Sequence, residues 1–225
     1  MGRLLAISDI HGNLEYFEKM LKKIELTKED RLVILGDMVD RGYDNMGTVF
    51  KIMELKKQGY NIITLMGNHE DMVIEIIENY DSVDELRNGV YGDSVSKNGT
   101  MLTFMEYMRS SEEDKKRFLE EIKSYEFYYE SDGYLFVHAG VEAKTPLEHQ
   151  SKYDMIWIRD GFIDKESHGL PYTVIFGHTP TIHLNEDQRF HIWRKNDKIG
   201  IDCGASFGGK LACLDVLNNI EYYIG

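Results

Sequence analysis

Five short polar motifs hold the side chains of this chain that are suited to binding a metal ion. These side chains are Asp9 and His11 in SDIHGN, Asp37 in GDMVDRG, Asn68 in GNHE, His138 before Ala-Gly, and His178 in GHTP. Mixed imidazole and oxygen donors favour Mn²⁺, Fe or Zn²⁺ over Ca²⁺ and Mg²⁺. A shared carboxylate could bridge two such ions about 3.5–4 Å apart, the arrangement of two-metal hydrolases.

An apolar run of strand length precedes each motif. These runs cover residues 4–8, 32–35, 62–66, 134–137 and 173–176. The first three alternate with helical patterns, of which the earliest begins near Asn13, a plausible N-cap. This βαβαβα order predicts an α/β fold with parallel strands. Because the carboxyl ends of such strands converge on one crevice, the five motifs are expected to meet there.

The remaining chain divides into a helical part and a β-rich part. Residues 81–123 are polar and helical without strand patterns, which predicts a helical cap or insertion. Further strands are expected at residues 199–202, 211–216 and 220–224. We expect one domain spanning residues 1–225, a length sufficient for a substantial core.

Charge and composition narrow the function classes. The net charge of −13 repels nucleic-acid backbones, so extended DNA or RNA is not an expected partner, whereas a small phosphorylated substrate remains compatible. No apolar run approaches the roughly 20 residues of a membrane span. The first residues reach Asp9 and His11 too early for a secretory signal, so a cytoplasmic location is expected. Cys203 and Cys213 are expected to be free thiols.

In this order and spacing, the five motifs resemble those of the phosphoprotein-phosphatase branch of the calcineurin-like metallophosphoesterases, in a compact bacterial or phage-type form. The resemblance runs from Asp9 to about Gly209. It implies a two-sheet β-sandwich flanked by helices, with a small helical insertion. It also implies two divalent metal ions, with manganese expected and iron or zinc as alternatives.

The resemblance assigns a role to each matching residue. Asp9, His11 and Asp37 would hold the first metal, and Asp37 would bridge to a second held by Asn68, His138 and His178. His69 would be the general acid and Asp40 the carboxylate that orients it. Arg41 and Arg159 would bind the phosphate. A metal-bridging hydroxide would attack phosphorus directly, so no phosphoenzyme is expected.

Structural interpretations compete with some of these assignments. Asp40 and Arg41 could form a loop salt bridge, and Arg159 could cover Trp157. The other histidines, His149, His168, His183 and His191, lack a flanking motif and are expected to pack or lie at the surface. Packing is also the expected role of Cys203.

Three functions from different classes remain open. The first is a serine/threonine protein phosphatase, favoured by Asp40 and Glu70, two positions at which the related diadenosine tetraphosphate hydrolases often differ. The second is such a hydrolase, of the symmetrical type, acting on dinucleoside polyphosphates. The third is a non-catalytic binding module that retains the fold, which the intact ligand set disfavours. The sequence does not decide among them, and it leaves phosphotyrosine as a further substrate class.

Overall fold

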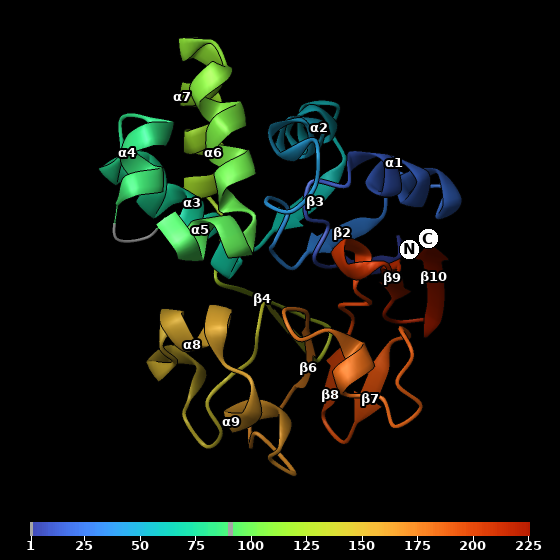
Figure 1. Cartoon of the computed structure of the whole chain (residues 1–225). Coiled ribbons are helices and arrows are strands. Elements are labelled where there is room, and N and C mark those ends of the chain that lie inside the picture. The colour runs from blue at the N-terminus through green and yellow to red at the C-terminus, as the bar shows by residue number, and fades with distance from the viewer. Residues whose placement is uncertain (1, 90–91) are drawn as a thin grey trace.

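The computed structural model describes residues 2–89 and 92–225, and its strands form two five-stranded sheets packed face to face (Figure 1). The first sheet has the order β10 (Ile220–Ile224), β9 (Leu211–Asp215), β1 (Leu4–Ile7), β2 (Arg31–Ile34) and β3 (Asn61–Thr64). The second has the order β4 (Tyr128–Ser131), β5 (Tyr134–Val137), β6 (Thr173–Phe176), β8 (Lys198–Gly200) and β7 (Trp193–Lys195). The expected parallel pairing of β1, β2 and β3 is confirmed, and β9 pairs with β1 antiparallel.

Alternate residues along the strands pack into different layers. Leu4 and Ala6 of β1 share a buried cluster with Phe136 of β5 and Ile175 of β6, which forms the core between the two sheets. Leu5 belongs instead to the cluster on the outer face of the first sheet, beneath helices. This alternation with period two is what buries both faces of a sandwich strand. The predicted two-sheet fold flanked by helices is confirmed.

Helices cover the outer faces of both sheets. They are α1 (Leu14–Lys23), α2 (Asn45–Lys57), α3 (Asn68–Asn79), α4 (Val83–Asn88), α5 (Gly92–Asn98), α6 (Thr100–Arg109), α7 (Glu112–Lys123), α8 (Lys152–Trp157) and α9 (Asp160–Ile163). Short 3₁₀ turns span Leu147–His149, Thr181–His183 and Ala205–Phe207. Helices α1 and α2 share a core with the first sheet, and α8 and α9 share one with the second.

Local sequence explains where α1 and α2 begin. Asp44 caps α2 by accepting a hydrogen bond from the Gly47 N–H at 3.1 Å. Asn13 occupies the N-cap position of α1, as predicted, but its side chain does not cap the helix. Its amide donates instead to the Ile10 and His11 carbonyls, because the preceding loop turns back toward the site.

The segment 81–123, predicted as a helical insertion, contains α4 to α7, which gather beside α3 at the upper left of Figure 1. Residues 90 and 91 of this range lie outside the described residues. Helices α4, α5 and α6 share a small core with α3, formed by Ile76, Leu86, Val95 and Phe104. Helix α7 instead packs Phe118 and Ile122 into the core of the first sheet. After α7 the chain returns to the end of β3, where the Met66 N–H donates to the Glu126 carbonyl at 2.7 Å.

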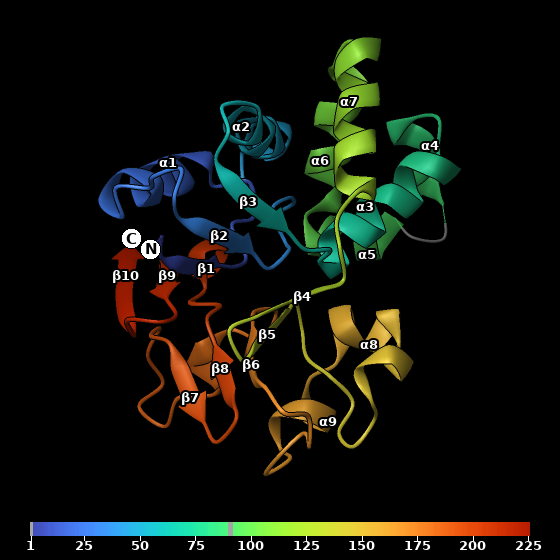
Figure 2. The ribbon, with the colours of Figure 1, turned by 180° about the vertical axis from the view of Figure 1, so that it is seen from behind.

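The two ends of the described chain lie side by side, near β1 and β10, in both views (Figures 1 and 2). None of the described helices combines the length and apolar character that crossing a membrane requires.

Candidate active site

The six predicted metal ligands all lie just beyond the carboxyl ends of strands, and all are buried. Asp9 and His11 follow β1, Asp37 follows β2, Asn68 opens α3 after β3, His138 follows β5 and His178 follows β6. The first four come from one sheet and the last two from the other. The structure therefore brings all six together where the two sheets meet.

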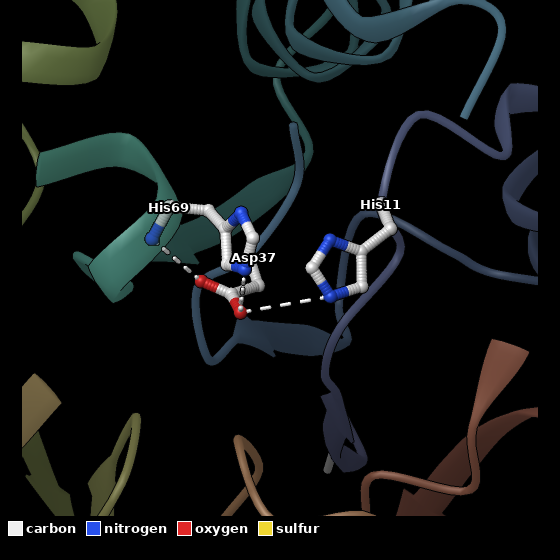
Figure 3. A group of neighbouring side chains, drawn as sticks. All are labelled: His11, Asp37 and His69. Carbon is white, nitrogen blue, oxygen red and sulfur yellow. Dashed lines mark hydrogen bonds and ion pairs between the residues drawn. The ribbon is translucent and has the colours of Figure 1, made fainter. Parts of the chain in front are cut away.

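One cluster centres on Asp37, with His11 and His69 on either side of its carboxylate (Figure 3). The Asp37 Oδ2 atom lies 3.6 Å from His11 Nε2 and 3.8 Å from His69 Nε2. Asp9 Oδ1 lies 3.9 Å from the same His11 nitrogen. Ligand atoms of His11, Asp37 and His69 thus lie within 4.8 Å of one another, and Asp9 approaches this cluster through its contact with His11.

A second cluster uses the other oxygen of Asp37. Asp37 Oδ1 lies 3.4 Å from His138 Nε2, and a nitrogen of His178 falls within 4.8 Å of both groups. The Asn68 Oδ1 atom lies 3.0 Å from His138 Nε2. Asp37 therefore belongs to both clusters, which is the geometry that a bridging carboxylate requires.

The hydrogen bonds of two histidines show that these clusters suit a cation. His11 Nδ1 lies 2.9 Å from the Val39 carbonyl oxygen, and His138 Nδ1 lies 2.7 Å from that of Leu35. A carbonyl oxygen only accepts, so each Nδ1 carries the proton and each Nε2 presents a lone pair. At His138 that lone pair faces the Asn68 oxygen, another acceptor. Two buried acceptors in contact fit a shared divalent ion, and such carbonyl contacts fix imidazole ligands in metalloproteins.

The electrostatics of the site support the same conclusion. Burial raises the pKa of Asp37 well above its ordinary value, and the nearby carboxylates Asp9 and Glu70 raise it further. Burial and the charge of Asp9 also raise the pKa of Asp202, a residue that the motifs did not identify. Burial lowers the pKa of His11 and His138, which keeps both rings neutral. Clustered carboxylates beside neutral imidazoles are stabilised by bound cations.

His69 forms a buried pair with Asp40. Its Nδ1 lies 2.7 Å from Asp40 Oδ2, and the hydroxyls of Thr100 and Thr103 donate to the same carboxylate. Burial raises the pKa of Asp40 to about 7, although both hydroxyls and the charge of Arg41 act in the opposite direction. Burial also lowers the pKa of His69, helped by the charge of Arg41. Nothing within the described structure pairs Asp40 with Arg41 as a loop salt bridge.

Both predicted phosphate-binding arginines border the metal clusters. Arg41 places Nη1 2.8 Å from His11 Nε2 and Nη2 3.1 Å from His69 Nε2. Its guanidinium also stacks on the half-exposed ring of Phe207, 4.7 Å from the ring centroid. Arg159 Nε lies 2.9 Å from His178 Nε2, so this arginine contacts a predicted metal ligand.

The backbone turns sharply at the site. Asp9, His11, Asp37, Asp40, Arg41 and His178 all have positive φ, between 49° and 71°. Residues other than glycine seldom adopt this left-handed conformation, and such strain concentrates at functional sites. The strained positions are occupied by the functional residues themselves and not by the glycines of the motifs.

Glu70 has a structural task that the sequence did not reveal. Its fully buried carboxylate accepts four backbone N–H bonds, from Asp37, Met38, Val39 and Gly67, at 2.7–3.2 Å. These bonds fix the loop after β2 against the start of α3. One sequence pattern could have indicated this role: Glu70 stands three residues after Gly67, at the N3 position where a capping box has a glutamate.

Residues without a motif fall outside the site, as expected. His168 is buried against Asp197, whereas the rings of His149 and His191 lie 3.9 and 3.2 Å from carboxylate oxygens of Glu148 and Asp187 near the surface. Cys203 is buried, and burial raises the pKa of its thiol, which makes the thiol unreactive.

Comparisons with known proteins agree with this geometry. Residues 2–217 match the family model described as calcineurin-like phosphoesterase. The chain is 28% identical to serine/threonine-protein phosphatase 1 of Salmonella typhimurium over 92% of this chain and 88% of that protein. It is also 28% identical to a symmetrical bis(5'-nucleosyl)-tetraphosphatase of Buchnera aphidicola, over 65% of this chain but 48% of that protein. A crystal structure of a candidate diadenosine tetraphosphatase superposes with a TM-score of 0.71, covering 99% of this chain and 93% of that one; at 19% identity this shows likeness of fold.

Proposed function

The chain belongs to the calcineurin-like phosphoesterase family, whose members depend on two metal ions, and from this premise we propose that it is a serine/threonine protein phosphatase. We assign the first metal to Asp9, His11 and Asp37, and the second to Asp37, Asn68, His138 and His178. Manganese is the proposed metal, with iron and zinc as the other candidates for this set of donors. The proposed partner is a phosphorylated protein.

Two divalent ions at these ligands would supply Lewis acidity for the phosphoryl oxygens and lower the pKa of the attacking water. The chain's own residues provide the rest of the chemistry. The guanidinium groups of Arg41 and Arg159 would move from their histidine contacts to the phosphoryl oxygens. A guanidinium group can bind two of these oxygens in a bidentate manner. His69, once protonated at Nε2, would give that proton to the departing oxygen as its bond to phosphorus breaks. Water attacks phosphorus directly, so a rapid-quench experiment should trap no phosphoenzyme.

The contact between His69 and Asp40 is the observation that favours phosphoserine and phosphothreonine as substrates. A serine or threonine alkoxide is a poor leaving group and benefits from a positioned acid. The 2.7 Å contact to Asp40 holds the His69 ring with Nε2 facing the cluster. The 28% identity to a serine/threonine-protein phosphatase, over 88% of that protein, supports this reading.

The second candidate is hydrolysis of dinucleoside polyphosphates, which the similarity to a bis(5'-nucleosyl)-tetraphosphatase favours. In that reaction a phosphate leaves, and a phosphate hardly needs protonation. The metal clusters and both arginines would have the same tasks, but the His69–Asp40 pair would contribute little.

A ³¹P NMR time course with Mn²⁺-loaded protein, a phosphothreonine peptide and diadenosine tetraphosphate in one tube tests the proposal. Inorganic phosphate growing at the expense of the peptide is the expected result. Growth of ADP with the peptide untouched would establish the symmetrical nucleotide hydrolase, and ATP with AMP would indicate asymmetrical cleavage. If neither substrate changes, hydrolysis by this site is refuted for both classes. A chelated sample serves as control and should show no change.

A further inference from the structure

We propose that helix α6 of the insertion positions the catalytic pair, with Thr100 and Thr103 holding the Asp40 carboxylate that in turn holds His69. The inference rests on the proposed function, because it assumes that His69 is the general acid. It assigns a task to a segment that carries no metal-binding motif. Thr100 and Thr103 are positioning residues, since neither contacts His69 or the clusters directly.

The contacts account for both oxygens of Asp40. Thr103 Oγ1 donates to Oδ1 at 2.5 Å, and Thr100 Oγ1 donates to Oδ2 at 2.5 Å, the oxygen that also contacts His69. The Asp40 N–H donates to Thr103 Oγ1 at 3.1 Å. All three residues are at least 99% buried, so no water can replace a missing hydroxyl without rearrangement. Together these bonds leave the carboxylate one orientation.

The start of α6 is built for this close approach. Gly99, the residue before the helix, has a φ of +86°, and a side chain there would meet the Arg41 backbone nitrogen at 2.6 Å. The helix therefore begins in contact with the backbone of Arg41, next to Asp40. The positive end of the helix dipole faces the buried carboxylate, which favours its charged form.

A third residue on the same face of α6 holds the C-terminal end of the loop formed by residues 40–46. Glu106 accepts hydrogen bonds from the Asn45 and Met46 N–H groups, each at 3.0 Å, at the start of α2. Positions 100, 103 and 106 are spaced by three, so they form one stripe along the helix. The three side chains thus hydrogen-bond to both ends of the loop 40–46, which contains Asp40 and Arg41.

The test compares variants that remove or keep the hydroxyls. Thr100→Val and Thr103→Val keep side-chain shape but lose the donor, whereas Thr100→Ser and Thr103→Ser keep it. Thr48→Val is the matched control, because Thr48 is fully buried on α2 and its hydroxyl donates to the Asp44 carbonyl, away from Asp40. Each Mn²⁺-loaded protein is assayed on aryl phosphates of graded leaving-group pKa and on a phosphothreonine peptide.

We expect each valine variant to retain metal and to hydrolyse 4-nitrophenyl phosphate within about threefold of the wild type. Its kcat/KM on the peptide should fall by about tenfold, the size of one lost hydrogen bond to a charged group, so the dependence on leaving-group pKa steepens. The serine variants and Thr48→Val should keep the wild-type dependence. A purely structural role would lower activity on all substrates equally, and that result would overturn the inference.

Different results would refute the role of α6 and the proposed function. A wild type that hydrolyses aryl phosphates, with valine variants of unchanged leaving-group dependence, refutes only the role of α6. A Mn²⁺-loaded wild type that hydrolyses no phosphate ester refutes the proposed function, and the inference falls with it. NMR of the Zn²⁺-loaded protein adds a readout without turnover: the Nδ1 proton of His69 should exchange faster in the valine variants, and unchanged exchange contradicts the positioning role.

Discussion

The two oxygens of Asp37 face different histidines, one at 3.6 Å in the first cluster and one at 3.4 Å in the second. Asp37→Asn removes the charge and replaces one oxygen by a donor that cannot bind a metal. We expect both ions to be lost together, with kcat/KM reduced by at least about a hundredfold. Elemental analysis alongside the phosphatase assay checks this, with Asp71→Asn, at an exposed position of α3, as the control. A variant that retains two ions would show that Asp37 does not bridge.

His69 should matter to the leaving group more than to the metals. Its Nδ1 is taken by Asp40 and its Nε2 faces Arg41, so the ring is placed as an acid at the edge of the first cluster. We expect His69→Asn to keep both ions and to slow alkyl phosphates by about 10²–10⁴, the usual contribution of a general acid. Hydrolysis of 4-nitrophenyl phosphate should fall much less, because nitrophenolate leaves without a proton. Equal losses on both substrates would contradict the proposed role.

The sequence identified the residues of the site, but not the residues that hold them in position. Asp9, His138 and His178 stand in motifs at strand ends, where strand topology alone brings them together. The hydroxyls of Thr100 and Thr103 approach from a helix some 60 residues away, and no local pattern encodes that contact. The strained backbone of the motif residues was also hidden, because aspartate and histidine in a loop adopt other conformations at least as readily.

At the scale of elements, Glu70 joins the loop after β2 to the first turn of α3. Glu70→Gln turns one acceptor into an amide that faces backbone N–H groups, so at least one buried bond is lost. We expect metal affinity to fall by about 10- to 100-fold, since groups that support ligands have effects of this size. Titration of the apo protein with Mn²⁺ against a fluorescent chelator measures it. Glu75→Gln, exposed on the same helix, should bind as the wild type does.

Among the elements, the edges of the second sheet were the hardest to predict, whereas β10 and β3, the edges of the first sheet, were expected. The inner strands β1, β2, β5 and β6 are short apolar runs and were expected. The edge strands β4, with sequence YYES, and β7, with sequence WRK, were missed. Each of these two strands pairs on one side only and carries polar side chains, so it lacks the continuous apolar pattern of an inner strand.

At the scale of the whole molecule, the metal site joins the two sheets. Asp37 and His11 extend from the first sheet, whereas His138 and His178 extend from the second. Ions that bind only the folded chain stabilise it by about 4 kcal/mol when present at a thousand times their Kd. We expect chelation to lower the melting temperature of the entire fold in one transition. Calorimetry with and without Mn²⁺ checks this, and an unchanged melting temperature would separate metal binding from sheet packing.

A second prediction at this scale concerns acid stability. Hydrogen bonds from the Arg3 side chain lower the pKa of buried Asp30, helped by Thr27. A carboxyl with a lowered folded-state pKa stabilises the fold above its unfolded pKa of about 3.9, and this contribution is lost as the pH falls below it. Asp30→Asn should therefore cost about 1–3 kcal/mol at pH 7 and progressively less in acid. Urea unfolding at several pH values measures the difference, with exposed Glu29→Gln as control. A cost that does not shrink in acid would contradict the assignment.

The helical segment 81–123 leaves the fold at the end of α3, and the chain returns beside the end of β3, where the Met66 N–H donates to the Glu126 carbonyl. Replacing this segment would leave the strand pairing of both sheets intact, although α7 packs Phe118 and Ile122 into the core of the first sheet. The replacement segment would bring its own residues to Asp40. A chimaera with a foreign insertion would inherit a new substrate surface and, in the same step, a new support for the acid. Changes in this segment would therefore be under two selective constraints. One is substrate binding, and the other is the transfer of a proton from His69 to the leaving group.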